Sequence, residues 1–417
     1  MLSKSIQRML VFCFSAMILL HGYVLWQARR SIPEGLPDFS GAYTAGRILR
    51  DGQGSRLYDD VLQESVQRSF SPLAVQKRGT ILPYIHLPFE ALLYLPLAHF
   101  SYLTAYAIWL GVNLALLGSI PFLLRRRLQA LGKAPLYFWL LAVLAFFPIF
   151  VALIQGQDSI LLLFLYCLAW TCLQRGTDLA SGSWLALGLY KYHLVVPFLL
   201  TLWRRQKLIA GFLSVAAVLG LISLAITGWP TLVGYPRYVL GTEHDLKYGF
   251  NSLPGLNTNL RGLISGLVPS AHRDLEIGLI VLLSVSVSLL MLYAASQTSS
   301  TDSEGRQALF ALGLVGTVLL SYHLYVHDLS LLFLAIVLVL EILLSDTSMS
   351  SGTRTTLYVS IALLFCSPLY LVLTLRYGQL RLLAIVLLIF FFGLLSFINS
   401  LQGRIGGTIS PPASAGR

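Results

Sequence analysis

Residues 208–226 read LIAGFLSVAAVLGLISLAI, a run that contains no charged residue. As a helix, this run is long enough to cross the roughly 30 Å hydrocarbon core of a membrane. Arg204, Arg205 and Lys207 precede it, and such basic residues mark the cytoplasmic end of a membrane helix. Apolar runs of similar length recur along the whole chain, whereas the alternating pattern of a membrane barrel does not. The sequence therefore predicts an all-α polytopic membrane protein.

The composition of the 417 residues agrees with this prediction. Hydrophobic residues make up 56% of the chain, charged residues 11%, and the mean hydropathy is +0.75, which excludes a set of soluble domains. The formal net charge of +11 raises the question of a nucleic-acid partner. The basic residues instead cluster at the ends of apolar runs, as in Arg125, Arg126 and Arg127, so we expect a lipid bilayer and no nucleic acid around this protein.

The expected architecture is a bundle of about 12 transmembrane helices, some short or broken, with both chain ends in the cytoplasm. It comprises a first transmembrane helix (1–28), an extracytoplasmic loop with surface and re-entrant helices (29–100), a transmembrane module (101–227), a second extracytoplasmic loop (228–273), C-terminal transmembrane helices (274–400) and a cytoplasmic tail (401–417). Within the first large loop, helices are predicted at 40–50 and, as an amphipathic surface helix, at 58–70.

A conflict of charges predicts a break in the segment 184–203. The segment has the length of one crossing, yet Arg175 before it and Arg204 after it both belong on the cytoplasmic side. Two short helices, running up and back and broken near 190–193, remove the conflict. Broken helices at membrane depth occur where they line a cavity, so we expect Lys191 to face a cavity and to meet an anion there.

This topology brings polar groups from five distant segments to the outer edge of the apolar core. They are the stretch around Asp38, the turn 155–158, Lys191 with His193, the loop 251–261 and the cluster 323–328. Asp38 is interpreted as a general base, with helix capping as the alternative. Lys191 is interpreted as an anion-binding group, and a structural ion pair with Asp158 is the alternative.

The cluster at 323–328 has two readings as well. His323, His327 and Asp328 either bind substrate or are ordinary polar residues at a helix end, and the spacing of four places both histidines on one helical face. Metal binding is a weak alternative because no third defined ligand accompanies them, so we expect no metal and no cofactor. Glu90 and Glu341, single acids near the ends of apolar segments, are interpreted as structural.

Five stretches together resemble glycosyltransferase family 87. They are DFSGAYTAGRILRDGQGSRLYD (38–59), LPFEALLYLPLAHF (87–100), ALIQGQDSILLLFLYCLAW (152–170), WLALGLYKYHLVVPFLLTLWRRQK (184–207) and SYHLYVHD (321–328). Members of this family are membrane glycosyltransferases of the GT-C type, related to mycobacterial polyprenol-phosphate-mannose-dependent α-mannosyltransferases. Each stretch alone is a loose match, while their order along residues 38–328 is fairly specific.

The resemblance implies a GT-C-type bundle and an inverting transferase. It moves a hexose, mannose by analogy, from a polyprenyl-phosphate-linked donor to a glycolipid or glycan acceptor at the extracytoplasmic face of the cell inner (plasma) membrane. Asp38 matches the catalytic aspartate, and Lys191 with Arg261 is assigned to the donor phosphate. The residues assigned to substrate binding are Tyr43, Gln157, Asp158, His193, Asn251, His323, His327 and Asp328.

Two departures from the family pattern affect these assignments. Tyr322 stands where many relatives have proline, and Tyr192 with His193 replaces smaller residues, so the substrate pockets are expected to differ from those of the best-known members. A transporter or flippase for a lipid or small molecule is the main alternative, in which the broken helix binds its substrate and no bond is broken. A non-catalytic subunit of an envelope-assembly complex is the other.

Overall fold

The computed structural model describes residues 4–244, 254–298, 303–346 and 348–407. Helices make up 82% of the structure, and no strand occurs in these ranges, which confirms the all-α class. The α-helices are α1 Lys4–Ala28, α2 Phe39–Arg50, α3 Asp60–Phe70, α4 Pro72–Arg78, α5 Ala91–Tyr94, α6 Tyr102–Arg125, α7 Leu136–Ala145, α8 Phe147–Gln155, α9 Ser159–Gln174, α10 Asp178–Leu187, α11 Tyr192–Val195, α12 Gln206–Thr227, α13 Trp229–His244, α14 Leu260–Leu267, α15 Arg273–Gln297, α16 Ser303–Leu320, α17 Leu332–Ser345, α18 Ser351–Phe365, α19 Ser367–Leu371 and α20 Leu383–Gly407. Short turns of helix that matter below are η2 Pro88–Glu90, η5 Gly188–Lys191, η6 Pro197–Thr201 and η10 Val326–Leu331.

Six helices of the described chain are long and apolar enough to cross a membrane, and two bent pairs bring the total to as many as eight. The six are Lys4–Ala28, Tyr102–Arg125, Gln206–Thr227, Arg273–Gln297, Val326–Ser345 and Leu380–Gln402. The bent pairs are α7 with α8, at 69°, and Ser351–Phe365 with Ser367–Arg376, at 62°. The expected total of about 12 spans is not confirmed, because segments such as α9, with 16 residues, form helices shorter than a full crossing.

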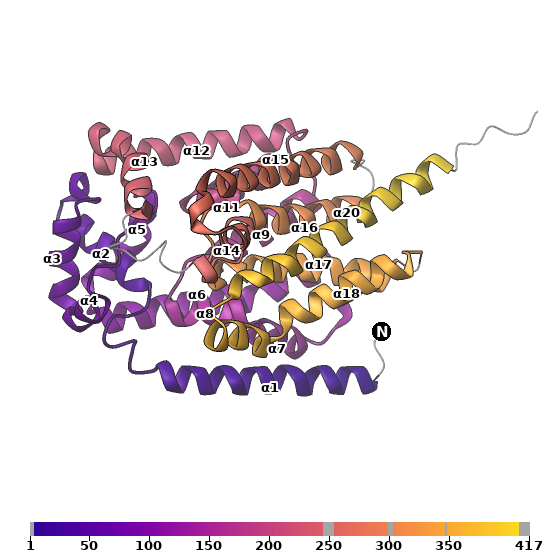
Figure 1. Ribbon diagram of the computed structural model, residues 1–417, viewed down its shortest axis with the longest axis horizontal. Helices are drawn as coiled ribbons and strands as arrows, with labels where there is room; N and C mark the ends of the chain where they lie inside the picture. The colour runs from indigo at the N-terminus through magenta and orange to yellow at the C-terminus, as the bar shows by residue number, and fades with distance from the viewer. Residues whose placement is uncertain (1–3, 245–253, 299–302, 347, 408–417) are drawn as a thin grey trace, which may run out of the picture.

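The long helices run side by side, and α2, α3, α4 and α5 gather at one end of the bundle (Figure 1). We call residues 29–101 the loop unit. Both helices predicted there are present, as α2 and α3, and Asp59 caps α3 by accepting hydrogen bonds from the backbone N–H groups of Val61 and Leu62. Helix α13 packs on the loop unit, since Tyr235 Oη donates to Ile85 O at 2.9 Å.

The predicted break in the segment 184–203 is present. Helix α10 ends at Leu187, and two short turns, η5 and α11, lead into η6. Arg205 and Asp178 form an ion pair of 3.1 Å, which joins the two ends of this stretch of chain. Lys191, in the middle, lies instead against Asp158 at the start of α9. The stretch therefore runs up to the level of Lys191 and back.

Candidate active site

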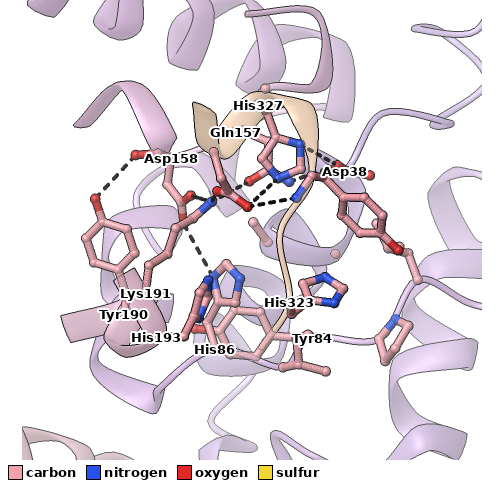
Figure 2. A pocket seen from close by; sticks show the side chains of 18 of the residues that line it. Asp38, Tyr84, His86, Gln157, Asp158, Tyr190, Lys191, His193, His323 and His327 are labelled. Atoms are coloured by element: carbon pink, nitrogen blue, oxygen red, sulfur yellow. Dashed lines mark hydrogen bonds and ion pairs between the residues drawn. The ribbon is translucent and has the colours of Figure 1, made fainter. Parts of the chain in front are cut away.

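A pocket of about 120 Å³ lies where the loop unit meets the helix ends of the bundle (Figure 2). It is lined by residues from α2, from the turn between α8 and α9, from η5 and α11, and from the segment between α16 and η10. Eight residues predicted for the site line it, namely Asp38, Gln157, Asp158, Lys191, His193, His323, His327 and Asp328. The topology derived from the sequence thus brings these distant segments together.

Asp38 stands at the start of α2, but its side chain makes no capping hydrogen bond. Its carboxylate oxygen Oδ2 accepts a hydrogen bond of 2.8 Å from Gln157 Nε2, and its backbone N–H donates to Gln155 Oε1 at 3.1 Å. The Nδ1 atom of His327 lies 3.9 Å from the same carboxylate oxygen. The side chain is 31% exposed, so the turn after α8 orients a carboxylate that a ligand can still reach.

Gly156 allows α2 to lie close to the turn that holds Asp38. Its φ of 61° is in the left-handed region, and a Cβ atom there would lie 2.8 Å from Cβ of Phe39. Helix α6 supports the turn from the other side, because Trp109 Nε1 donates to Gly156 O at 2.9 Å and Asn113 Nδ2 to Gln157 O at 3.4 Å. The position of Gln157 is therefore fixed by the packing of α2, α6 and α8.

Lys191 forms the buried centre of the charge cluster. Its Nζ atom lies 2.8 Å from Asp158 Oδ1 and 2.6 Å from Asp328 Oδ1, and all three side chains are at most 3% exposed. It also donates to Ser159 Oγ at 2.8 Å and to Gln157 Oε1 at 3.3 Å. An ammonium group has three N–H donors, so these neighbours already occupy them all. The predicted anion partners of Lys191 are thus the carboxylates of Asp158 and Asp328. These two carboxylates compensate the cost of burying the ammonium group.

Gln157 connects the two halves of the pocket. Its NH₂ group donates to Asp38, and its carbonyl oxygen accepts from Lys191, so one amide bridges the exposed carboxylate and the buried ammonium. This arrangement fixes the orientation of the Gln157 amide. A flipped amide would place its NH₂ group against the Lys191 ammonium and its oxygen against the Asp38 carboxylate.

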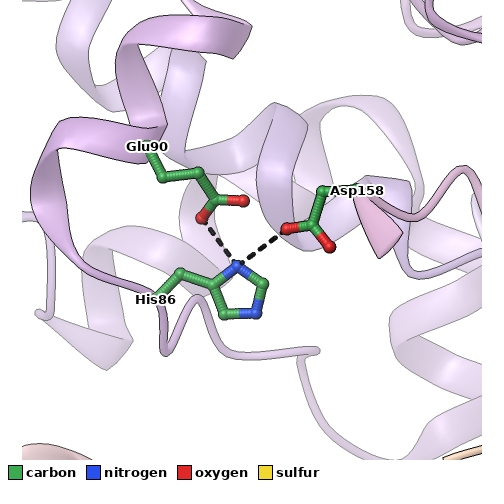
Figure 3. Close-up of side chains that lie close together, drawn as sticks. All are labelled: His86, Glu90 and Asp158. Carbon is green, nitrogen blue, oxygen red and sulfur yellow. Dashed lines mark hydrogen bonds and ion pairs between the residues drawn. The ribbon is translucent and has the colours of Figure 1, made fainter. Parts of the chain in front are cut away.

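His86 and Glu90 add a second charged group beside Asp158 (Figure 3). His86 Nδ1 lies 2.6 Å from Glu90 Oε2 and 3.3 Å from Asp158 Oδ2, and Tyr84 Oη donates to Glu90 Oε2 at 2.9 Å. Burial disfavours the imidazolium, but Glu90 and Asp158 outweigh burial and raise the pKa of His86 to about 10. Burial raises the pKa of Glu90 to about 8, although the charge of His86 opposes the shift.

Among the described residues, His86, Glu90 and Asp158 form the group that could hold a metal ion. Their ligand atoms lie within 4.8 Å of one another. Imidazole and carboxylate groups suit several divalent cations. Two cations of the chain already lie beside these acids, because His86 binds a proton and Lys191 contacts Asp158. Any metal ion there has to displace the proton of His86.

His323 and His327 both line the pocket, but they do not share a helical face as predicted. The chain between α16 and η10 is not helical, because asparagine side chains bind its backbone. Asn259 Nδ2 donates to Ser321 O at 2.6 Å, and Asn257 Oδ1 accepts from Leu324 N at 3.3 Å. Burial lowers the pKa of His323 to about 4, so this imidazole is neutral near pH 7 and can either donate or accept a hydrogen bond.

A family model for glycosyltransferase family 87 matches residues 84–321, more than half of the chain. The chain belongs to glycosyltransferase family 87. Membership makes this protein a membrane glycosyltransferase, with a sugar donor, an acceptor and a lipid bilayer as partners. The comparison with curated proteins found no match, and the comparison with solved structures found none either.

The family 87 match includes predicted pocket residues and two residues that the prediction lacked. The pocket residues His86, Gln157, Asp158 and Lys191 lie within the matched residues, as does Glu90, which contacts His86 from behind the pocket wall, whereas Asp38 precedes the match and Asp328 follows it. Sequence reasoning did not find His86 or Glu90 as site residues. The two residues are four positions apart, a spacing that places side chains on one face of a helix. Pro88 lies between them and argues against a helix there, so the sequence does not indicate that they meet.

Two predicted site residues, Tyr43 and Arg261, do not line the pocket of this family 87 protein. Tyr43 is buried, its Oη donates to Phe100 O at 2.7 Å, and it lines a different pocket on the other side of α2. Arg261 donates from Nη1 to Tyr322 O at 3.0 Å and thereby supports the segment that carries His323. Asn251 lies outside the described residues.

Proposed function

We propose that this family 87 protein transfers a hexose, mannose by resemblance, from a polyprenyl-phosphate-linked donor to a glycolipid or glycan acceptor on the extracytoplasmic face, with inversion and with Asp38 as general base. One observation carries the proposal. Of the three carboxylates that line the described pocket, Asp158 and Asp328 are buried against Lys191, while Asp38 remains 31% exposed and is held by a neutral amide. An accessible and oriented carboxylate suits proton abstraction.

In the proposed reaction, Asp38 accepts the proton of an acceptor hydroxyl while the hydroxyl oxygen attacks the anomeric carbon of the donor sugar. The bond between this carbon and the phosphate oxygen breaks, and its electron pair leaves with the polyprenyl phosphate. Attack from the side opposite the leaving group inverts the configuration. A carboxylate within hydrogen-bond reach of the acceptor contributes typically about 10²- to 10⁴-fold to such a step.

The negative charge that develops on the departing phosphate requires cations nearby. The assignment of Lys191 and Arg261 to the donor phosphate stays a prediction. Lys191 has two carboxylate partners, so a direct contact with phosphate requires it to release one of them. Arg261 lies next to the pocket through its hydrogen bond to Tyr322 O, and a direct contact with phosphate requires the segment 321–325 to move.

The arrangement of charges also favours the extracytoplasmic face. Residues of the loop unit, among them Asp38 and His86, line the pocket. The helices of the loop unit gather at one end of the bundle (Figure 1). Arg125, Arg126 and Arg127 lie at the opposite end of α6, and basic residues of this kind favour the cytoplasm.

The test is Asp38→Asn in purified full-length protein, with Asp51→Asn as the matched control. Asp51 lies in the same loop unit and pairs with Arg50 at the surface, away from the pocket. Transfer from polyprenyl-phosphate mannose to acceptors in a membrane extract is expected to fall about 10²- to 10⁴-fold for Asp38→Asn and to persist for Asp51→Asn. Unchanged turnover of a folded Asp38→Asn protein would refute the general-base assignment. A donor that carries glucose, run in parallel, identifies the sugar.

A further inference from the structure

A second pocket, of about 410 Å³, lies between α2 and the start of α6. We call it the Arg47 pocket, and it is lined by Pro33, Tyr43, Arg47, Arg50, Phe70, Phe100, Ser101, Tyr102 and Leu103. It shares no lining residue with the candidate active site. Four of its lining residues are aromatic and two are arginines, so it combines an apolar wall with positive charge.

The two arginines differ in what they bind. Arg50 is engaged within the chain, because its Nε donates to Asp51 Oδ1 at 2.9 Å and its Nη1 to Ala98 O at 2.6 Å. Arg47 has no hydrogen-bond acceptor and no carboxylate partner among the described residues, and its buried Nε atom is left unsatisfied. Its guanidinium carbon lies 5.9 Å from the centre of the Tyr43 ring. A half-buried guanidinium without an acceptor is a costly arrangement unless a ligand supplies one.

The start of α6 provides a second group in the Arg47 pocket that can bind an anion. Ser101 caps α6, a helix of 24 residues, and the first turn of such a helix leaves backbone N–H groups that attract negative charge. The unsatisfied Nε atom of Arg47 and the helix terminus therefore belong to one pocket.

The surroundings of the Arg47 pocket indicate which kind of anion it takes. Helix α6 has the length and composition of a membrane span, so its first turn lies at a membrane surface. Phe100 and Leu103 at the pocket rim are 49% and 48% exposed, and Ile108 and Val112 continue the exposed apolar surface along α6. Phosphate at the headgroup level with an acyl chain along α6 matches this order of polar and apolar groups.

We propose that the Arg47 pocket binds the phosphate group of an anionic membrane lipid. The guanidinium of Arg47 contacts the phosphate oxygens, the first turn of α6 faces the same phosphate, and an acyl chain lies along α6 from Leu103. The site is separate from the sugar-transfer pocket, so it does not depend on the identity of the base or of the sugar.

The experiment measures binding of phosphatidylglycerol to delipidated full-length protein by native mass spectrometry. Loss of a charge-assisted hydrogen bond is expected to weaken binding by about tenfold to a hundredfold in Arg47→Gln. Arg68→Gln is the matched control, because Arg68 lies in the same loop unit and pairs with Glu64 at the surface. Leu103→Gln places a polar group on the exposed apolar rim of the pocket and is expected to weaken binding several-fold, so the test stands even if Arg47→Gln fails to fold.

Phosphatidylglycerol that binds equally well to wild-type protein and to Arg47→Gln would overturn the proposal. Equal losses in Arg47→Gln and Arg68→Gln would overturn it too, since they would show a general effect of charge. The last measurement adds inorganic phosphate to the protein–lipid complex. Phosphatidylglycerol that stays bound supports a site for the phosphate group of a lipid. Displacement of the lipid by inorganic phosphate at equal concentration overturns this assignment in favour of a free anion.

Discussion

Replacing Lys191 by methionine removes the one ammonium group shared by two buried carboxylates. Asp158 keeps a cationic neighbour after this change, because His86 Nδ1 lies 3.3 Å from its other oxygen. Asp328 keeps a hydrogen bond from the neutral Ser159 Oγ at 3.0 Å, but its basic neighbour His327 Nε2 lies at 3.5 Å. The loss of Lys191 therefore leaves Asp328 as the uncompensated buried charge.

The magnitude follows from the burial of these groups. All three side chains are at most 3% exposed, and removal of one partner from a buried pair typically costs about 3–5 kcal/mol in the free energy of unfolding. Lys191→Met should be destabilised by about this amount. Lys191→Met/Asp328→Asn should recover most of it, because the carboxamide carries no charge and can still accept from Ser159 Oγ, which donates to Asp328 at 3.0 Å.

Thermal unfolding in detergent measures both variants through the reaction of Cys167 with a thiol dye. Cys167 is fully buried and reacts once the bundle opens, so Cys13, Cys172 and Cys366 are first replaced by serine. Wild-type stability of Lys191→Met would refute the charge cluster, and a double variant no more stable than Lys191→Met would refute the role of Asp328. A stable double variant that binds donor as tightly as wild-type protein would remove Lys191 from the donor-phosphate site.

Three further predictions concern the same pocket. Gly156→Ala should lower the free energy of unfolding by about 1–3 kcal/mol, because the new Cβ would lie 2.8 Å from Phe39 Cβ. Gly176 has a similar φ of 73° but open space around it, so Gly176→Ala should cost less. The pKa of His86 rises from 6.5 to about 10 in the folded protein, so protonation of His86 stabilises the fold fully below pH 6.5 and no longer does so near pH 10. The melting temperature should therefore fall between pH 6.5 and pH 10. The fall should be smaller in His86→Gln. Dialysis against EDTA should leave sugar transfer unchanged, because protonated His86 and Lys191 already contact Asp158. A loss that Mn²⁺ or Mg²⁺ restores would contradict this assignment of the cations.

The parts of the fold that the sequence predicts are those with a local cause. Apolar runs of sufficient length predict the membrane helices, and the positive charges of Arg175 and Arg204 on both sides of one run predict the break at Lys191. The number of spans is less predictable, because an apolar run does not show whether its helix is straight. Helices α7 and α8, for example, form one apolar run with a bend of 69° at Phe146.

The site is predictable to the extent that topology alone brings its residues together. Glu90 and Glu341 have the same local setting in the sequence, yet Glu341 accepts hydrogen bonds from the backbone N–H groups of residues 129–131 while Glu90 binds His86 at the pocket. Only the tertiary structure distinguishes them. Tyr43 illustrates a different reason, since five positions along a helix rotate a side chain by about 140°. Asp38 and Tyr43 therefore face different pockets, although they belong to one short motif.

The three members of the charge cluster leave the ribosome at different times. Asp158 and Lys191 are close in sequence and enter the membrane with neighbouring helices, whereas Asp328 follows Lys191 by 137 residues. At roughly 5–20 residues per second, this gap corresponds to about 7–27 s of synthesis. During that interval the ammonium group has Asp158 as its partner, and the cluster closes once α16 and η10 have been inserted. Completion of the pocket is therefore a late step of biogenesis, and a chain truncated before residue 328 retains Lys191 with only one of its two carboxylate partners.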